Sequence, residues 1–271
     1  AYNEALAYAK ERAQFGKKII NFPAVYDMLS RMKAKLDAGR SILYQTARYV
    51  DIYKALEDIA RDRTLTPEER KEMKLYSRLA DAFTPLAKGM NSEYANQNAY
   101  DAISVHGGSG FIMEYKCQRL FRDARIFSIY EGTTQLQVVA AIRYVTNGTY
   151  LGIIKEMLEK EVAPEFQALK ERVAKMVEKY EDAINYVKAA GNNDLHDFLA
   201  RRLYEMTAEI IMSLLILDDA TRAPELFAKS ANVYVRYAEG TVAGHYAYIK
   251  EFKAEDLADF LAAAPEEAPA E

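Results

Sequence analysis

One carboxylate in the sequence, Glu131, has the neighbours that proton removal from carbon requires. It follows a segment, residues 126–130, that is apolar at four of its five positions, and it precedes Gly132 and Thr133, where a helix is predicted to begin. Apolar neighbours raise the proton affinity of a carboxylate, and backbone N–H groups at a helix start can polarise a substrate carbonyl. The pattern favours a general base for a proton alpha to a carbonyl. The alternative is an acidic residue that only complements the helix dipole.

The elements that must position this carboxylate are predicted to be helices, because apolar residues recur at helical spacing through most of the 271 residues. Pro85 should bend or break the third of these helices, whereas Thr66 and Glu69 predict a capping box at its start. No sustained alternation predicts a strand, so the predicted fold class is all-α. The predicted helices cover approximately residues 1–15, 23–61, 67–105, 114–120, 133–146, 150–190, 194–219, 224–251 and 254–263.

The strongest boundary signal in the chain is Asn147-Gly148. It divides the sequence into a predicted helical bundle over residues 1–146 and a second helical domain over 150–263. Residues 264–271 are rich in Ala, Pro and Glu and are predicted to be disordered. The first helix begins without a capping residue or an initiator Met, and we therefore expect that the chain was cut from a larger protein.

Composition narrows the functional classes. The net charge is −4, from 36 basic and 40 acidic residues, and no basic run with interleaved aromatic residues suggests nucleic-acid binding. The single cysteine, Cys117, excludes an internal disulfide and suits a reducing compartment, so a cytoplasmic location is expected. The three histidines are scattered, and no metal site is predicted. The longest apolar stretch, near residues 210–217, is far too short to span a membrane.

Several motifs occur in a fixed order around Glu131. Residues 130–135 read Y-E-G-T-T-Q and are preceded by R-D-A-R-I at 122–126, which resembles the signature of the acyl-CoA dehydrogenase family. Residues 11–17 look like the family's R-x-x-F-G-K motif, and residues 107–111 resemble its G-G-x-G-[FY] turn. The predicted helix at 23–61 matches in position. The resemblance covers residues 1–146 and implies the family's C-terminal four-helix bundle, followed by a second helical bundle that is found in larger members.

The resemblance implies a flavin-dependent oxidation of acyl-CoA to trans-2-enoyl-CoA. Glu131 would remove the alpha proton while hydride passes from the beta carbon to the flavin, and an electron-transfer flavoprotein would accept the electrons. The family pattern also implies that the backbone N–H of Glu131 donates to the thioester carbonyl, where charge develops in the transition state. Tyr130 and Gly132 would contact the acyl-CoA substrate, although Tyr130 is equally well interpreted as a core aromatic residue.

The same resemblance implies an FAD site. Arg12 would bind the pyrophosphate, for which its planar guanidinium is suited, and Phe15 would lie against the cofactor across a subunit interface, so a homo-oligomer is expected. The turn at Gly107 and Gly108 would approach the adenosine end. Two further FAD contacts are implied at the start of the helix that follows Glu131, where anions are favoured, namely Thr133 and Gln135.

Two positions depart from the family pattern. Ser104 stands where many members have a glutamine, so one FAD contact of the family is not predicted here. His106, next to the glycine pair, is interpreted as a cap or surface histidine. The N-terminal helical and middle β-domains of the family match nothing in this sequence, so these residues alone are expected to bind FAD poorly and to lack turnover. Two alternatives stay open: an acyl-CoA oxidase that uses oxygen, and a helical assembly module without catalysis.

Overall fold

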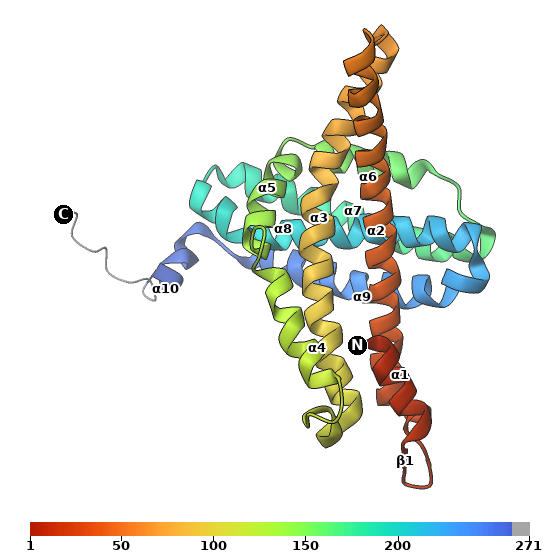
Figure 1. Cartoon of the computed structure of the whole chain (residues 1–271). Coiled ribbons are helices and arrows are strands. Elements are labelled where there is room, and N and C mark those ends of the chain that lie inside the picture. The colour runs from red at the N-terminus through yellow and green to blue at the C-terminus, as the bar shows by residue number, and fades with distance from the viewer. Residues whose placement is uncertain (262–271) are drawn as a thin grey trace, which may run out of the picture.

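The computed structural model describes residues 1–261 and is helical almost throughout, which confirms the predicted all-α class (Figure 1). The predicted disordered tail, residues 264–271, lies outside the described residues. The helices are α1 (Tyr2–Glu11), α2 (Pro23–Asp62), α3 (Pro67–His106), α4 (Cys117–Ala124), α5 (Thr134–Thr146), α6 (Thr149–Glu159), α7 (Gln167–Ala190), α8 (Asn193–Arg222), α9 (Pro224–Glu251) and α10 (Ala258–Leu261). Short 3-10 turns cover Ile19–Asn21, Gly107–Gly110, Arg125–Ser128, Pro164–Phe166 and Ala254–Leu257.

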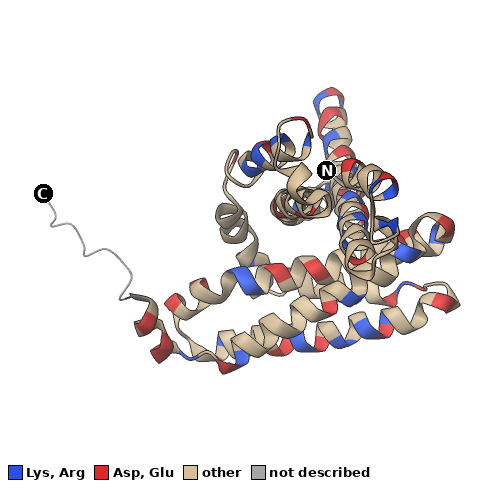
Figure 2. Cartoon of the chain, turned by 90° about the horizontal axis from the view of Figure 1, so that it is seen from below, with Lys and Arg blue, Asp and Glu red and all other residues tan. Residues whose placement is uncertain are grey.

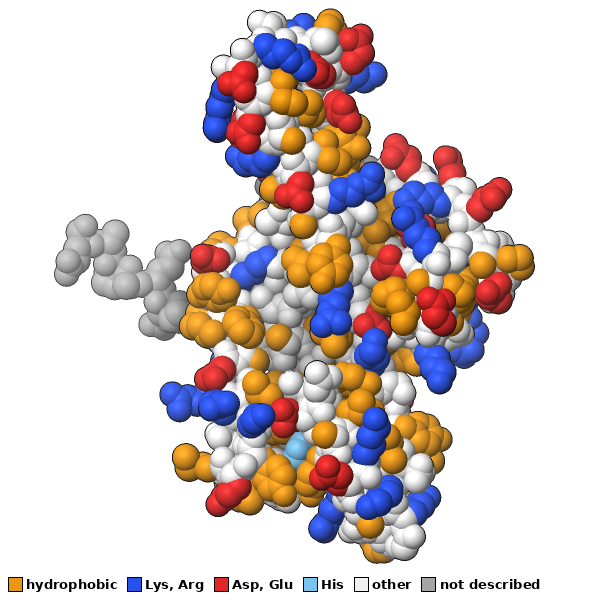
Figure 3. All heavy atoms as spheres, turned by 45° about the vertical axis from the view of Figure 1, so that its right-hand side comes forward, with side chains coloured by type: hydrophobic (Ala, Val, Ile, Leu, Met, Phe, Trp, Pro, Cys, Tyr) orange, Lys and Arg blue, Asp and Glu red, His pale blue; other side chains and the backbone are white. Residues whose placement is uncertain are grey.

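The helices α2 and α3 form a long pair whose free tip carries charged side chains of both signs (Figures 1 and 3). The predicted capping box begins α3: the Thr66 side chain accepts from the Glu69 N–H at 3.1 Å, and the Glu69 carboxylate accepts from the Thr66 N–H at 2.8 Å. The helix then continues through Pro85 without the break that the sequence suggested. Phe83 and Leu86 on either side of the proline are fully buried. The burial of these side chains offsets the cost of a proline in a helix interior, which is about 3 kcal/mol.

The second half of the chain lies across this pair. Helices α7, α8 and α9 form a layer that crosses α2 and α3 (Figures 1 and 2). Tyrosines fasten the two parts, since Tyr150 donates to the carbonyl of Ala82 at 2.6 Å and Tyr204 to that of Pro85 at 2.9 Å. One core contains buried residues of both halves, and a second, smaller core lies around α1. The chain turns at Gly148, which has a left-handed φ of 79°, but apolar packing continues across that turn.

Three predicted elements differ in the structure. Helix α1 ends at Glu11, and a two-stranded antiparallel hairpin follows, with β1 (Ala13–Gln14) paired to β2 (Lys17–Lys18). Its turn places Phe15 at φ 47° and Gly16 at φ 80°, as a two-residue hairpin loop of type I′ requires. The short helix expected at 114–120 is α4, which begins three residues later. The helix expected over 150–190 is two helices, α6 and α7, because the chain is extended after Glu159 and Pro164 begins a short 3-10 turn before α7.

Within residues 1–261, none of the helices combines the length and apolar character needed to cross a membrane.

Candidate functional site

The segment that carries Glu131 is a tight turn between the 3-10 turn at Arg125–Ser128 and α5, and we call residues 127–133 the base turn. Its backbone is left-handed twice in succession, at Glu131 (φ 48°) and Gly132 (φ 89°). Thr133 ends the turn as the N-cap of α5, with its side chain accepting from the Leu136 N–H at 3.2 Å. A left-handed non-glycine residue costs about 1–2 kcal/mol, so contacts elsewhere must hold this turn in place.

Glu131 stands at the edge of a cavity of about 460 Å³. Two long helices and the base turn enclose that cavity: α2 contributes Leu43 and Thr46, α3 contributes one face, and Phe127 and Tyr130 close it. The Glu131 side chain is exposed, and Tyr130 is half exposed. A core position for Tyr130 is therefore wrong, and its ring is available to a ligand. Of the sequence-predicted trio, Tyr130 and Glu131 line this cavity, and Gly132 follows them in the chain.

Lys88, a residue of α3 that sequence reasoning did not select, reaches the base turn. Its Nζ donates to the carbonyl oxygens of Phe127 at 2.9 Å and of Gly132 at 2.6 Å. The Gln137 amide also donates to the Gly132 carbonyl, at 3.2 Å. By contrast, no protein acceptor within the described residues receives the backbone N–H of Glu131 or Gly132. The carbonyls of Phe127 and Gly132 are thus bound by protein side chains, and two N–H groups of the turn are left for another acceptor.

The start of α5 is tied to the bundle by a chain of polar contacts. Thr134 is buried, and its hydroxyl donates to the Glu93 carboxylate at 2.6 Å. Glu93 in turn lies 3.8 Å from the guanidinium of Arg201, which belongs to α8. Arg201 also pairs with Glu205 at 2.8 Å. The second half of the chain therefore reaches the helix that follows the base turn. Thr133 and Gln135, the predicted FAD contacts here, are exposed on that helix start.

The other predicted cofactor residues meet in a second cavity of about 630 Å³. It brings together Arg12, Phe15, Gly107 and Gly108, which lie almost 100 residues apart in the sequence. Arg12 is exposed, and its guanidinium has no ion-pair partner among residues 1–261. The Phe15 side chain is 86% exposed. Gly107 adopts φ 61° and ψ −140°, a conformation closed to L-residues with side chains, so glycine is required there. Ser104 lines the same cavity.

His106 corrects an expectation. It is buried rather than at the surface, and it makes no side-chain cap. Its ring stacks on Tyr8 with centroids 4.3 Å apart, and its Nδ1 lies 2.7 Å from the Ala102 carbonyl oxygen. The reason is that α1 packs against the last turn of α3 and covers the ring. Cys117 lies 3.4 Å from the same Nδ1, and burial raises the pKa of its thiol, which makes it a packing residue rather than a nucleophile.

The predicted site residues therefore form two groups. Lys88 at the base turn and Gly107 at the second cavity lie 19 residues apart on or next to α3, which corresponds to roughly 28 Å along a helix. The base turn holds the predicted substrate and catalytic residues, together with Thr133 and Gln135. The second cavity holds the remaining predicted FAD residues. Spacing along the sequence could not reveal that division, because it follows from which end of α3 each segment packs against.

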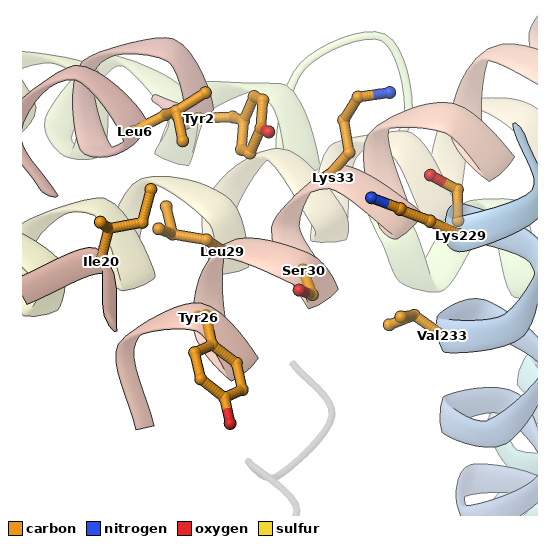
Figure 4. A pocket seen from close by; sticks show the side chains of 10 residues that line it. Tyr2, Leu6, Ile20, Tyr26, Leu29, Ser30, Lys33, Lys229 and Val233 are labelled. Atoms are coloured by element: carbon orange, nitrogen blue, oxygen red, sulfur yellow. The ribbon is translucent and has the colours of Figure 1, made fainter. Parts of the chain in front are cut away.

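A third cavity, of about 250 Å³, lies between α1, α2 and α9 (Figure 4). Its walls are mostly apolar, with Lys33 and Lys229 at one end. Lys33 already contacts the buried carboxylate of Asp37, which also accepts from Ser230. None of the predicted site residues lies in this cavity, and the paired Lys33 gives it little capacity for an anion.

Both halves of the chain match known protein families. Residues 1–145 match the family model described as "Acyl-CoA dehydrogenase, C-terminal domain", and residues 146–257 match the model described as "Acyl-CoA dehydrogenase C terminal". The chain belongs to the acyl-CoA dehydrogenase family.

Named relatives agree with this assignment. The caffeyl-CoA reductase-Etf complex subunit CarC of Acetobacterium woodii is 37% identical over 137 residues, which is 51% of this chain and 30% of that protein. The butyryl-CoA dehydrogenase of Syntrophomonas wolfei is 29% identical over 244 residues, which is 82% of this chain and 38% of that protein. The chain thus spans about a third of the length of these curated relatives.

A solved structure shares the fold. The acyl-CoA dehydrogenase of Bacillus anthracis, crystallised with FAD, superimposes with a TM-score of 0.69 over 96% of this chain and 48% of its own, at 21% identity. At that identity the likeness shows the fold alone.

Proposed function

We propose that this chain is part of an FAD-dependent acyl-CoA dehydrogenase in which Glu131 removes the alpha proton of an acyl-CoA thioester. One observation carries the proposal: Glu131 is held in a left-handed conformation beside a cavity, and its N–H and that of Gly132 bind no acceptor within residues 1–261. Strained backbone of this kind concentrates at functional sites. Membership of the family gives the chemistry, and the base turn gives a residue that can perform it.

The base turn supplies two functions in this proposal. The Glu131 carboxylate accepts the alpha proton, and the electron pair of the broken C–H bond moves toward the thioester carbonyl. The N–H groups of Glu131 and Gly132 then bind the carbonyl oxygen, on which negative charge grows. Because that charge is larger in the transition state than in the bound substrate, these donors lower the barrier more than they tighten binding. Tyr130 provides apolar surface for the acyl chain.

The second cavity fits one end of FAD. An arginine without an ion-pair partner in the described chain suits a diphosphate, the exposed ring of Phe15 suits a flat aromatic group, and the glycine turn permits close backbone approach. When bound, FAD supplies the acceptor for the electrons that leave the substrate. Because the second cavity and the base turn lie at different levels of α3, we propose that one FAD is bound by Arg12, Phe15, Gly107 and Gly108 of one copy and by Thr133 and Gln135 of another.

The electron acceptor is proposed to be an electron-transfer flavoprotein. The Acetobacterium relative is named as a subunit of a complex with such a protein, which supports this choice over oxygen. That relative is named a reductase, and a single carboxylate can serve either direction, since the group that removes the alpha proton in oxidation returns it in reduction. Oxidation is the direction proposed here, in accordance with the family assignment.

The test is Glu131→Gln in the FAD-loaded protein in which this chain occurs. The variant should retain bound yellow flavin but lose about 10²–10⁴-fold in the rate at which acyl-CoA bleaches the flavin under anaerobic conditions, the usual contribution of a general base. Glu114→Gln, the same substitution at an exposed glutamate outside the motifs, is the matched control and should bleach normally. Bleaching of Glu131→Gln at the control rate would remove Glu131 from its role. A ladder of acyl-CoA chain lengths in the same assay would define the substrate class.

A further inference from the structure

We propose that Lys88 is a positioning residue for Glu131, and that its ammonium holds the base turn in the conformation in which the carboxylate and the neighbouring N–H groups face the substrate. The inference rests on the proposed function of Glu131. Lys88 is half-buried in α3 and lines the cavity at whose edge Glu131 lies. It does not belong to the motifs on which the family resemblance was recognised.

Lys88 contacts residues before and after Glu131 in the chain. Its Nζ binds the carbonyl of Phe127, four residues before Glu131, and the carbonyl of Gly132, immediately after it. An ammonium has three donors and can hold both carbonyls at once. The same Nζ lies 5.6 Å from the centroid of the Tyr130 ring, within the range of a cation–π contact. One side chain thus contacts the residues on both sides of Glu131 and fixes the two ends of the turn to α3.

The direction of these bonds decides which groups the turn presents. In a trans peptide the C=O and the next N–H point in opposite directions. Because the Gly132 carbonyl faces Lys88, the Thr133 N–H points away from α3, on the side where a cofactor contact is proposed. Loss of the ammonium would free the turn to rotate its carbonyls outward, which would place acceptors where donors are needed.

A lysine suits this task better than a neutral donor. Hydrogen bonds from a charged donor are roughly twice as strong as neutral ones, and the left-handed backbone at Glu131 needs strong restraint. Gln137, which also donates to Gly132, supplies only a neutral amide. The Lys88 ammonium is engaged by carbonyl oxygens rather than by the Glu131 carboxylate. It can therefore hold the turn without occupying the group that must accept a proton.

The experiment compares Lys88→Met, which keeps the length and removes every donor, with Lys88→Arg, which keeps charge and donors. Lys74→Met, an exposed lysine of the same helix, is the control. All are prepared as the FAD-loaded protein. Two quantities are measured: backbone hydrogen exchange of residues 127–133, and the bleaching rate and Kd with acyl-CoA. Lys88→Met should increase exchange in the base turn at least tenfold and slow bleaching about 10–100-fold with little change in Kd. Lys88→Arg should recover most of both, and the control should resemble wild type.

The outcomes separate this inference from the proposed function. Wild-type exchange and wild-type bleaching in Lys88→Met would overturn the positioning role, even if Glu131→Gln is inactive. Increased exchange with unchanged bleaching would also overturn it, since the turn would then move without consequence for the base. Normal bleaching by Glu131→Gln would instead overturn the proposed function. If Lys88→Met does not fold, Lys88→Gln, which can serve only one of the two carbonyls at a time, replaces it with the same criteria and an intermediate expected effect.

Discussion

The base turn and the hairpin at residues 13–18 use the same backbone device. Each places a bulky or charged residue in the left-handed region and follows it with a left-handed glycine: Phe15 with Gly16, and Glu131 with Gly132. No other non-glycine residue between positions 1 and 261 has a positive φ. The two sites differ in their support. The base turn is bound to α3 through Lys88. Within residues 1–261, the hydrogen bonds of the hairpin side chains go to segments beside it in sequence; for example, the Lys18 ammonium donates to the Glu11 carbonyl at 2.6 Å.

This difference suggests a division of labour. A catalytic base must lie at a defined distance from the proton that it removes. The backbone that carries the base is therefore held in position by a rigid helix before the substrate binds. A cofactor clamp can be completed by the cofactor itself or by a second subunit. The exposed Phe15 ring, whose nearest aromatic partner is Phe22 at 6.4 Å, fits the second case. Residues 127–132 of the base turn should therefore respond to the interior of the bundle more than to FAD, and the hairpin should behave in the opposite way.

The largest expected effect concerns the interior on which α3 rests. Glu209 of α8 is buried and accepts from the Tyr94 hydroxyl of α3 at 2.7 Å, and burial raises the pKa of Glu209 to about 7. A folded-state pKa above the unfolded value of 4.5 means that this stabilisation is complete below pH 4.5 and is lost as pH rises to about 7. The free energy of unfolding should fall by about 3 kcal/mol across this range on account of Glu209.

Urea unfolding of wild type and Glu209→Gln at a series of pH values measures this contribution. The variant should lose the Glu209 part of the decline, and the difference between the two proteins excludes other groups such as Asp219, whose pKa burial also raises. Protection factors of the base-turn amides, which correct for the pH dependence of intrinsic exchange, should fall over the same pH range, because Lys88 binds that turn to α3. Protection factors of the hairpin amides should stay constant. The same pH dependence in both turns would contradict the proposed difference in their support.

A smaller effect is expected from a matched pair of glycine substitutions. Gly132→Ala would bring a Cβ within 2.8 Å of the Gln137 amide, which must then leave the Gly132 carbonyl. At Gly16 an added Cβ meets nothing within 4 Å, so only the left-handed φ opposes alanine, at about 1 kcal/mol. Gly132→Ala should therefore slow flavin bleaching about 30-fold, equivalent to about 2 kcal/mol, and Gly16→Ala by only a few-fold. Equal losses in stopped-flow bleaching would show that the two turns are supported alike.

The helices were predictable because their signals are local. Thr66 and Glu69, within four residues, predict the start of α3, and Pro23 predicts the start of α2. The motifs around Glu131 and Arg12 likewise lie in short stretches of sequence. The hairpin was not predictable, because strands of two residues are too short to show an alternating pattern of apolar residues. A glycine at position 16 also predicts the end of a helix as readily as a tight turn.

Contacts between distant segments were not predictable. Lys88 looks like any other helix lysine, and its partners are backbone carbonyls 39 and 44 residues away, which leave no mark in side-chain type. The burial of His106 depends on how α1 packs against α3, and one helix alone does not reveal it. The roles of Phe15 and Glu131 stay predictions that Phe15→Ala and Glu131→Gln test, and the role of Arg12 also stays a prediction.

The hairpin should show its own dependence. Phe15→Ala should weaken FAD binding about tenfold, equivalent to about 1.4 kcal/mol, because it removes a proposed contact with the cofactor. Since the ring is exposed and has few protein contacts, the substitution should leave the fold unchanged. Exchange in the base turn should stay as in wild type. Leu226→Ala, which removes an exposed apolar side chain of α9 outside both cavities, is the control and should bind FAD normally. Titration of apoprotein with FAD, followed by flavin fluorescence, measures both. A change in base-turn exchange without a change in FAD affinity would contradict the division.

The smallest expected effect tests how far the support of the base turn extends. Arg201 of α8 reaches Glu93, which accepts from Thr134 at the start of α5. Arg201 is 45% exposed and 3.8 Å from Glu93, so the pair is worth less than about 1 kcal/mol. Arg201→Gln should slow bleaching about two- to threefold and leave FAD affinity unchanged, whereas Arg222→Gln, an exposed arginine at the end of the same helix, should do neither. A twofold loss confined to Arg201→Gln would make the second half of the chain a support for the base turn. Identical rates for the two variants would place the limit of that support at α3.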